Sequence, residues 1–284
     1  MPNTVTPNEA GDARRANSLR ANDLWLEVFL IFNFLCLTGD VALAHSENHF
    51  RARVEYLPLW FSLAAAVVLS ASLFARLRCN WHSAWRDIGH FVGWASIAIG
   101  TAGVVYHLDS RFFYERTLKS LTYAAPFAAP LAYVALGCLL LMNRIVVPRG
   151  REWPRWVLFF ALGGFAGNFV LSLSDHAANG FFHWTEWIPV ISSAFAVGFL
   201  VTPLLLDVGR GFFWLCAGVL ALQMFVGALG FLLHGLADLH GPAAGLFENV
   251  ISGAPPFAPL LLPDLSILGF IGIAAMNREA RDPS

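Results

Sequence analysis

Long apolar runs constrain this chain more than any other feature. Eight stretches of about 20 residues consist almost entirely of apolar side chains, which is the length needed to cross a hydrocarbon layer of about 30 Å. Such runs lack the alternation of a half-buried strand, and a helix satisfies its backbone polar groups within the segment. The predicted spans are Leu24–Ala44, Leu57–Ala75, Ile88–Leu108, Tyr123–Met142, Trp156–Leu173, Trp187–Leu206, Phe212–Leu236 and Phe257–Met276.

The charge content agrees with a membrane protein. Only 13% of the 284 residues are charged, whereas a soluble domain has about 25%. We therefore predict an all-α, polytopic membrane bundle of eight transmembrane helices without a soluble module. The lipid bilayer is its first partner and no nucleic-acid partner is expected, while the oligomeric state is left open.

The distribution of positive charge predicts the orientation in the membrane. Short loops rich in Lys and Arg stay in the cytoplasm. Five cations lie on one side of the predicted bundle, namely Arg51, Arg53, Arg111, Arg116 and Lys119. The other thirteen, on the side of the termini, are Arg14, Arg15, Arg20, Arg76, Arg78, Arg86, Arg144, Arg149, Arg151, Arg155, Arg210, Arg278 and Arg281. We expect a protein of the cell (inner) membrane with both termini in the cytoplasm.

The two halves of the chain resemble each other. Five pairs of short segments recur in the same order at separations between 127 and 135 residues: NFLCLTGD with NFVLSLSD, EYLP with EWIP, GTAGVVYH with GALGFLLH, PFAAP with PFAP, and MNR with MNR. Repeats at a constant separation indicate a duplicated unit. Four helices per unit is an even number, so the halves share one topology and form a parallel repeat.

This repeat divides the chain. We expect a cytoplasmic polar tail (1–23), a first four-helix repeat (24–144), a cytoplasmic Arg-rich linker (145–155), a second four-helix repeat (156–278) and a short cytoplasmic tail (279–284). The segment VALAH (Val41–His45) resembles a signal-peptidase site. Because the first predicted helix has a counterpart in the second half, we expect no cleavage after Ala44.

Histidines and carboxylates collect at the outer ends of the predicted helices. The outer loops of the second half have no Lys or Arg, so a cation site belongs more naturally there. The proposed ligands, or partners of ligands, are His176, His183, His234, His240, Asp175, Asp238, Glu186 and Glu248. Secondary candidates in the first half are His45, His49, His107, Asp40 and Glu55.

Imidazole and carboxylate donors suit Zn, Fe, Mn or Cu, and a carboxylate beside a metal-bound histidine fixes its tautomer. We therefore predict a transition-metal site at the outer, periplasmic mouth of the bundle. Such a site is compatible with a metalloenzyme that acts on a lipid or small molecule. The residues alone do not establish that the protein is an enzyme.

Other interpretations remain open. The same polar groups could serve structure alone, or a proton or ion path in a transporter or channel. His107 and His234 could ligate a haem, and an assembly subunit would need no cofactor. Asp264 follows Pro263 in the last apolar run. We expect it to cap that helix, with a kink that points the acid into the bundle as the alternative.

Overall fold

The computed structural model describes residues 7–79, 81–117, 119–120, 125–146, 152–178, 180–243 and 245–279, with side chains from residue 23 onward. Every regular element among them is helical. The first half contains α1 (Pro7–Ser46), η1 (Arg53–Glu55), α2 (Tyr56–Cys79), α3 (His82–Asp109), α4 (Phe112–Glu115) and α6 (Leu131–Ile145). The second half contains α7 (Glu152–Ala178), η2 (Trp184–Glu186), α8 (Trp187–Leu205), α9 (Arg210–Leu239), α10 (Leu246–Ser252), η3 (Ala258–Leu260) and α11 (Leu261–Glu279).

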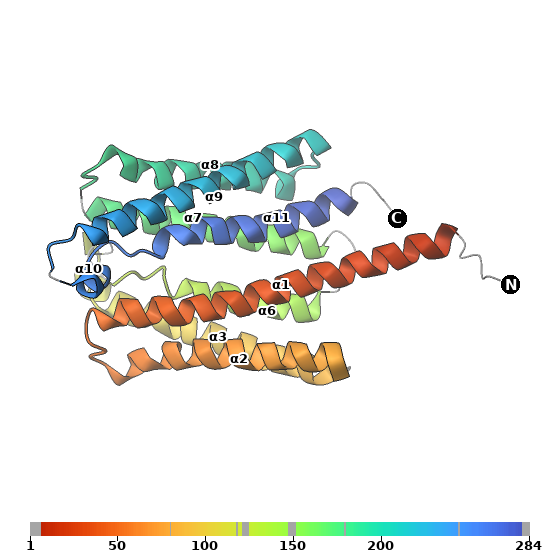
Figure 1. Cartoon of the computed structure of the whole chain (residues 1–284), viewed down its shortest axis with the longest axis horizontal. Coiled ribbons are helices and arrows are strands. Elements are labelled where there is room, and N and C mark those ends of the chain that lie inside the picture. The colour runs from red at the N-terminus through yellow and green to blue at the C-terminus, as the bar shows by residue number, and fades with distance from the viewer. Residues whose placement is uncertain are drawn as a thin grey trace.

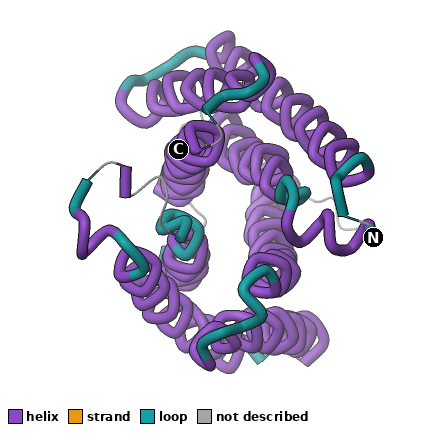
Figure 2. The backbone as a smooth tube through the Cα atoms, turned by 90° about the vertical axis from the view of Figure 1, so that its left-hand side faces the viewer, coloured by secondary structure: helices purple, strands orange, loops and turns teal. Residues whose placement is uncertain are grey.

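The long helices lie side by side in two groups (Figure 1). Helix α1 packs on α2 and α6, and α3 packs on α2 and α6, which makes the first group. Helices α7, α8, α9 and α11 make the second in the same way. The groups meet where α1 contacts α11 and where α6 contacts α7. Figure 2 looks onto the end of the bundle that carries α10, which we call the outer end.

Each group has its own hydrophobic core. Leu30, Phe34 and Leu140 are fully buried in the first core, and Phe165 and Leu220 are fully buried in the second. The first core also includes residues of α7 and α11, so the two groups are packed together rather than merely linked.

Seven helices are long and apolar enough to span a membrane within the described residues, whereas the sequence predicted eight. The exception is the predicted span Tyr123–Met142. Residues 125–130 form turns that include Pro126 and Pro130, and α6 begins only at Leu131. Proline has no N–H to donate and disfavours helix at the preceding residue. The 15 residues of α6 reach about 22 Å, less than the hydrocarbon thickness.

Helix α1 starts at Pro7 and so includes most of the polar segment before the predicted span Leu24–Ala44, while its membrane-spanning part, Asp23–Ser46, agrees with that span. Helix α11 begins at Leu261, which places Asp264 within its first turn instead of at a cap position. The expectation of a capping Asp264 was therefore wrong.

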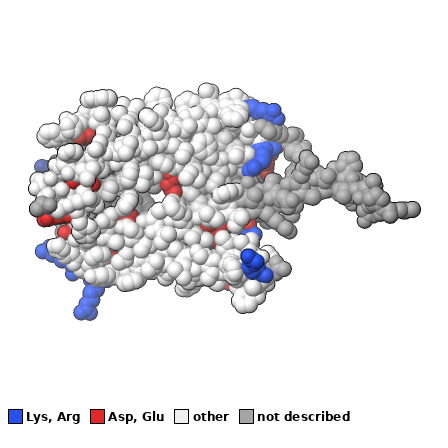
Figure 3. Space-filling model, viewed as in Figure 1, with Lys and Arg blue, Asp and Glu red and all other residues white. Residues whose placement is uncertain are grey.

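The charge distribution matches that of a multi-pass membrane protein. On the face shown in Figure 3, Lys and Arg gather at the two ends of the long axis and the flank between them is largely uncharged. Acidic side chains nevertheless appear part-way along that flank. Intramembrane carboxylates are expensive and therefore call for a specific explanation.

Candidate functional site

The loop between α1 and α2 connects a histidine at the end of one helix with a glutamate just before the next. The Phe50 amide donates to the His45 carbonyl at 3.0 Å, and Phe50 has a φ of 50°. Its ring stacks on Tyr56 with centroids 4.5 Å apart. Glu55 Oε1 accepts a hydrogen bond from the Ala52 amide at 3.3 Å. A positive φ is unusual for a bulky residue. The stacked ring and the two hydrogen bonds therefore hold the loop in this one conformation.

The loop between α7 and α8 has the same shape. The Phe181 amide donates to the His176 carbonyl at 3.0 Å, and Phe181 has a φ of 52°. Its ring stacks on Trp187 at 3.9 Å. Glu186 Oε1 accepts from the His183 amide at 3.2 Å. In both loops a histidine ends one helix, a glutamate precedes the next, and the backbone between them makes the same turn. The imidazoles differ, because His176 Nδ1 lies 3.6 Å from Glu186 Oε2 whereas His45 Nδ1 lies 3.2 Å from the Val41 carbonyl oxygen.

A second histidine comes from the end of α3. His107 Nδ1 is 3.0 Å from the Pro126 carbonyl oxygen. One turn earlier, Gly103 lies against Pro130, and a Cβ at Gly103 would come within 2.8 Å of the proline Cβ. The small residue lets the proline segment approach α3 closely, and this approach brings the carbonyl to the imidazole.

Helix α9 repeats that arrangement. His234 Nδ1 is 2.8 Å from the Pro255 carbonyl oxygen. A Cβ at Gly230 would come within 2.8 Å of the Cβ of Pro259. In both helices the glycine allows close packing against a proline segment, and this packing places the imidazole one turn further along.

In the first half these residues form a group that we call cluster A, made of His45, His107, Glu55 and Asp40. The imidazole centroids of His45 and His107 are 6.4 Å apart. His107 also interacts electrostatically with Glu55, and Asp40 interacts with His45. All four were secondary candidates in the sequence.

In the second half they form cluster B, made of Asp175, His176, Glu186 and His234. His176 Nδ1 lies 3.6 Å from Glu186 Oε2. His234 interacts electrostatically with both Asp175 and His176. Four of the eight primary candidates are thus brought together.

The backbone carbonyls determine which nitrogen of each imidazole is available. A carbonyl oxygen only accepts, so the Nδ1 atoms of His107 and His234 carry the proton and donate. Their Nε2 atoms then carry a lone pair. This tautomer can bind a metal ion or accept a proton at Nε2. His45 Nδ1 is oriented in the same way by the Val41 carbonyl at 3.2 Å.

Each cluster also holds a buried carboxylate oxygen without a hydrogen bond. These atoms are Glu55 Oε2 in cluster A and Glu186 Oε2 in cluster B. Leaving such an atom unpartnered is unfavourable. The two oxygens belong to the same loop position in both halves, and Glu186 Oε2 faces His176 Nδ1 at 3.6 Å.

The remaining predicted ligands lie elsewhere. His49, His183, His240 and Glu248 have exposed side chains. Asp238 is 3% exposed, and neither of its carboxylate oxygens has a hydrogen bond. The sequence predicted one outer mouth, whereas the structure separates its residues into two clusters and these outlying positions.

No group of three His, Cys, Asp or Glu side chains close enough to hold one metal ion occurs in the part of the chain that the structure describes. The clusters therefore contain pairs of approaching donors rather than a closed coordination shell. His107 and His234, proposed together for haem, lie on α3 and α9, on opposite sides of the bundle (Figure 1). That pairing has no geometric support.

A buried ion-pair network that was not predicted from the sequence lies in the first four-helix group, at the end away from cluster A. Arg144 donates to both carboxylate oxygens of Glu27 at 2.6 Å, and the two side chains have no exposed surface. Trp85 lies between two guanidinium groups, 3.7 Å from Arg144 and 4.0 Å from Arg76. Glu27 could have indicated this network from the sequence. It lies within the apolar run that begins at Leu24, where an acidic side chain requires a partner.

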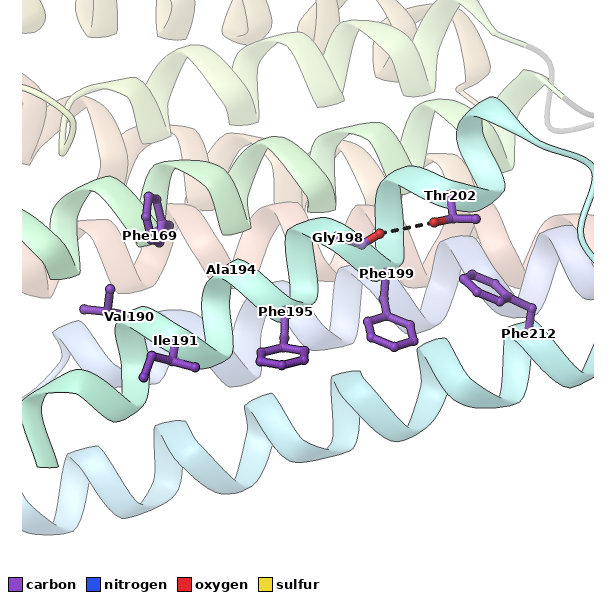
Figure 4. Close-up of a pocket in the computed structure, with 9 residues that line it drawn as sticks. All are labelled: Phe169, Val190, Ile191, Ala194, Phe195, Gly198, Phe199, Thr202 and Phe212. Carbon is purple, nitrogen blue, oxygen red and sulfur yellow. Dashed lines mark hydrogen bonds between the residues drawn. The ribbon is translucent and has the colours of Figure 1, made fainter.

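A surface cavity of about 540 Å³ lies along α8 (Figure 4). Its lining includes Phe169, Ile191, Phe195, Phe199 and Phe212. The hydroxyl of Thr202, its one polar side chain, donates to the Gly198 carbonyl at 3.2 Å. The cavity therefore presents an almost entirely apolar surface.

No family model, curated protein or solved structure matches this chain. The class of protein consequently rests on the fold and the distribution of charge. Both define a multi-pass, α-helical integral membrane protein.

Proposed function

We propose that the chain is a duplicated four-helix unit and that each unit binds a divalent transition-metal ion at the outer end. The observation that carries the proposal is the shared geometry of clusters A and B. In each, a loop histidine interacts with a histidine whose Nδ1 is anchored by a backbone carbonyl, and the loop glutamate interacts with one of the two, His107 in cluster A and His176 in cluster B.

The loops support the duplication in a specific register. His45, Phe50 and Glu55 correspond to His176, Phe181 and Glu186 at a constant offset of 131 residues. In this register both halves read H-x2-N-x-F-x4-E, followed by an aromatic residue, an aliphatic residue and Pro. The Asn-Phe pairs at Asn33 and Asn168 do not follow it, and their side chains bond to different partners, Asp264 and Ser193.

The donor atoms suit a metal of the Zn, Fe, Mn or Cu type. Neutral imidazole nitrogens and carboxylate oxygens are ligands for these ions. An ion bound tetrahedrally to two Nε2 atoms at about 2.0–2.1 Å would hold the ring centroids about 5 Å apart. The centroids in cluster A are 6.4 Å apart, so binding would draw the two imidazoles together. Rotation of the glutamate toward the histidines completes the set.

Two histidines and a carboxylate leave coordination positions open. Open positions distinguish catalytic from structural metal sites and admit water or substrate. This arrangement suits a metalloenzyme that acts on a lipid or small molecule at the outer leaflet. The role proposed for the chain itself is metal binding.

The test is metal analysis of the purified protein, prepared without a polyhistidine tag. We expect about two ions per chain, with about one lost in His45→Ala/His107→Ala and about one in His176→Ala/His234→Ala, because each pair supplies one site. The matched control is His49→Ala/His183→Ala, which removes two exposed outer histidines and should keep both ions. Absence of metal after Zn, Fe, Mn and Cu have each been offered, or equal loss in the control, rejects the proposal.

Glu55→Gln and Glu186→Gln distinguish the role of each glutamate as a metal ligand from its role in the structure of the loop. The amide oxygen keeps the bond to the loop backbone while the charge disappears. We expect metal affinity at that site to fall by about 10–100-fold, measured by competition with a chelating dye. Unchanged affinity in both variants would remove the glutamates from the sites.

We also propose that the outer end faces the periplasm and both termini face the cytoplasm, as the excess of Arg near the termini favours. Cys79, exposed at the end of α2, provides a native probe. We expect a membrane-impermeant maleimide to label Cys79, in a Cys36→Ser background, only after the membrane is opened, and to label Phe182→Cys, in a Cys36→Ser/Cys79→Ser background, in intact cells. The reverse pattern would invert the orientation.

A further inference from the structure

An acidic side chain lies between the two four-helix units, away from both clusters. Asp264 Oδ1 on α11 accepts a hydrogen bond from Asn33 Nδ2 on α1 at 2.9 Å. Both side chains are half-buried. Because α1 belongs to the first unit and α11 to the second, this bond joins the two units.

The pair lies deep in the membrane. Asn33 precedes His45 of the outer end by twelve residues on one continuous helix, which corresponds to about 18 Å at 1.5 Å per residue. In a hydrocarbon layer of about 30 Å, this depth is near the middle. A carboxylate there carries a large desolvation cost, and such groups are typically part of ion or proton pathways.

One face of α1 connects this depth with the outer end. Asn33, Cys36 and Asp40 are spaced by three and four residues and so lie on the same side of the helix. Cys36 interacts electrostatically with both Asp264 and Asp40, and its side chain is exposed. Polar and ionisable groups thus follow the seam from the outer end to Asp264.

We infer that Asp264 and Asn33 form a proton-binding site in the middle of the membrane, between the two units, that is reached by water from the outer end along the Cys36 side of α1. The proton is held on the Asp264 carboxyl group, and Asn33 keeps that group in the seam. A carboxyl group that gains and loses a proton at this position is what a proton-driven carrier built from two parallel units requires.

The surroundings of Asp264 suit a single titrating group. Helix α11 packs against α1, α7, α9 and η3. Among the described residues, Asn33 and Cys36 of α1 interact with the Asp264 side chain, and α7, α9 and η3 contribute no charged partner to it. The inference does not rest on metal binding, since none of these groups belongs to the two histidine pairs.

Infrared difference spectroscopy of the reconstituted protein tests the site. We expect a carboxylic-acid C=O band that appears on acidification, disappears in Asp264→Asn and moves in frequency in Asp264→Glu. Asp175→Asn, which changes a carboxylate of cluster B, is the matched control and should keep the band. Asp264→Glu retains a carboxyl group, so it remains informative if the asparagine variant fails to fold. A wild-type spectrum without such a band, or the same band in Asp264→Asn, overturns the inference.

Access from outside is tested with the native thiol of Cys36 in a Cys79→Ser background. We expect a small, charged, membrane-impermeant methanethiosulfonate to modify Cys36 from the outer side, and prior modification to slow hydrogen–deuterium exchange of the Asp264 band at least about tenfold, because it blocks the hydrated face of α1. Cys216, which is buried, serves as the unreactive control. An unmodified Cys36, or exchange that modification leaves unchanged, refutes access by this route.

Discussion

Glu27→Gln is expected to lower the free energy of unfolding by about 3–5 kcal/mol, because it leaves the Arg144 guanidinium buried without a counter-charge. Glu27 accepts two 2.6 Å bonds from Arg144 and further bonds from Trp85 and Asn143, each at 3.3 Å. Glutamine conserves the volume, so the loss reports the charge. The measurement is unfolding in mixed detergent and dodecyl sulfate micelles, followed by circular dichroism.

Two further variants make this prediction specific. Glu27→Gln/Arg144→Met removes both charges and should recover most of the loss, since a buried ion pair contributes little over apolar packing of similar size. Glu115→Gln breaks the exposed pair with Arg111, where the bond is 2.7 Å and the side chains are over 40% exposed, and should cost below about 1 kcal/mol. If the double variant is as unstable as the single one, an unpaired charge is not the cause.

Gly137→Ala is expected to destabilise the protein by about 1–3 kcal/mol through overpacking between α3 and α6. A Cβ at Gly137 would lie 2.6 Å from the Gly93 carbonyl oxygen and 3.1 Å from the Ile97 backbone nitrogen. Backbone atoms cannot move aside as the end of a side chain can, so the two helices must separate. The same unfolding titration measures the effect.

Gly163→Ala provides the matched control for this prediction. Gly163 also lies within a long helix, but a Cβ added there would meet no neighbouring side chain or helix within 4 Å. Alanine favours the helix by about 0.5–1 kcal/mol over glycine, so stability should rise slightly. Opposite signs for the two substitutions are the expected result, and a gain in Gly137→Ala would contradict the close α3–α6 packing.

The class of the protein follows from the sequence because membrane insertion depends on local hydropathy along the chain. Seven of the eight predicted spans correspond to helices that are long and apolar enough to cross a membrane. The exception is the predicted span Tyr123–Met142. Its helix α6 is shorter because Pro126 and Pro130 delay its start, and a count of apolar residues does not take this into account. The duplication and the metal site remain proposals.

The candidate site was predictable in part. The chain shows which histidines stand at helix ends, and the pair His234 and His176 was among the primary candidates. It does not show that His240 and His183 are exposed, since about half a turn of helix is enough to change an inward side chain into an outward one. Nor does it reveal that Asp238 is buried apart from the others.

The sequence by itself determined that this chain forms apolar helices that cross a membrane, with imidazoles and carboxylates at one end. Only the tertiary structure decided that His45 meets His107, that Glu27 meets Arg144 and that Asp264 meets Asn33. Hydropathy is a property of each segment and is nearly uniform around these helices. Which side chains meet is instead decided by the orientation of each helix about its axis and by the close helix contacts that glycine and proline allow.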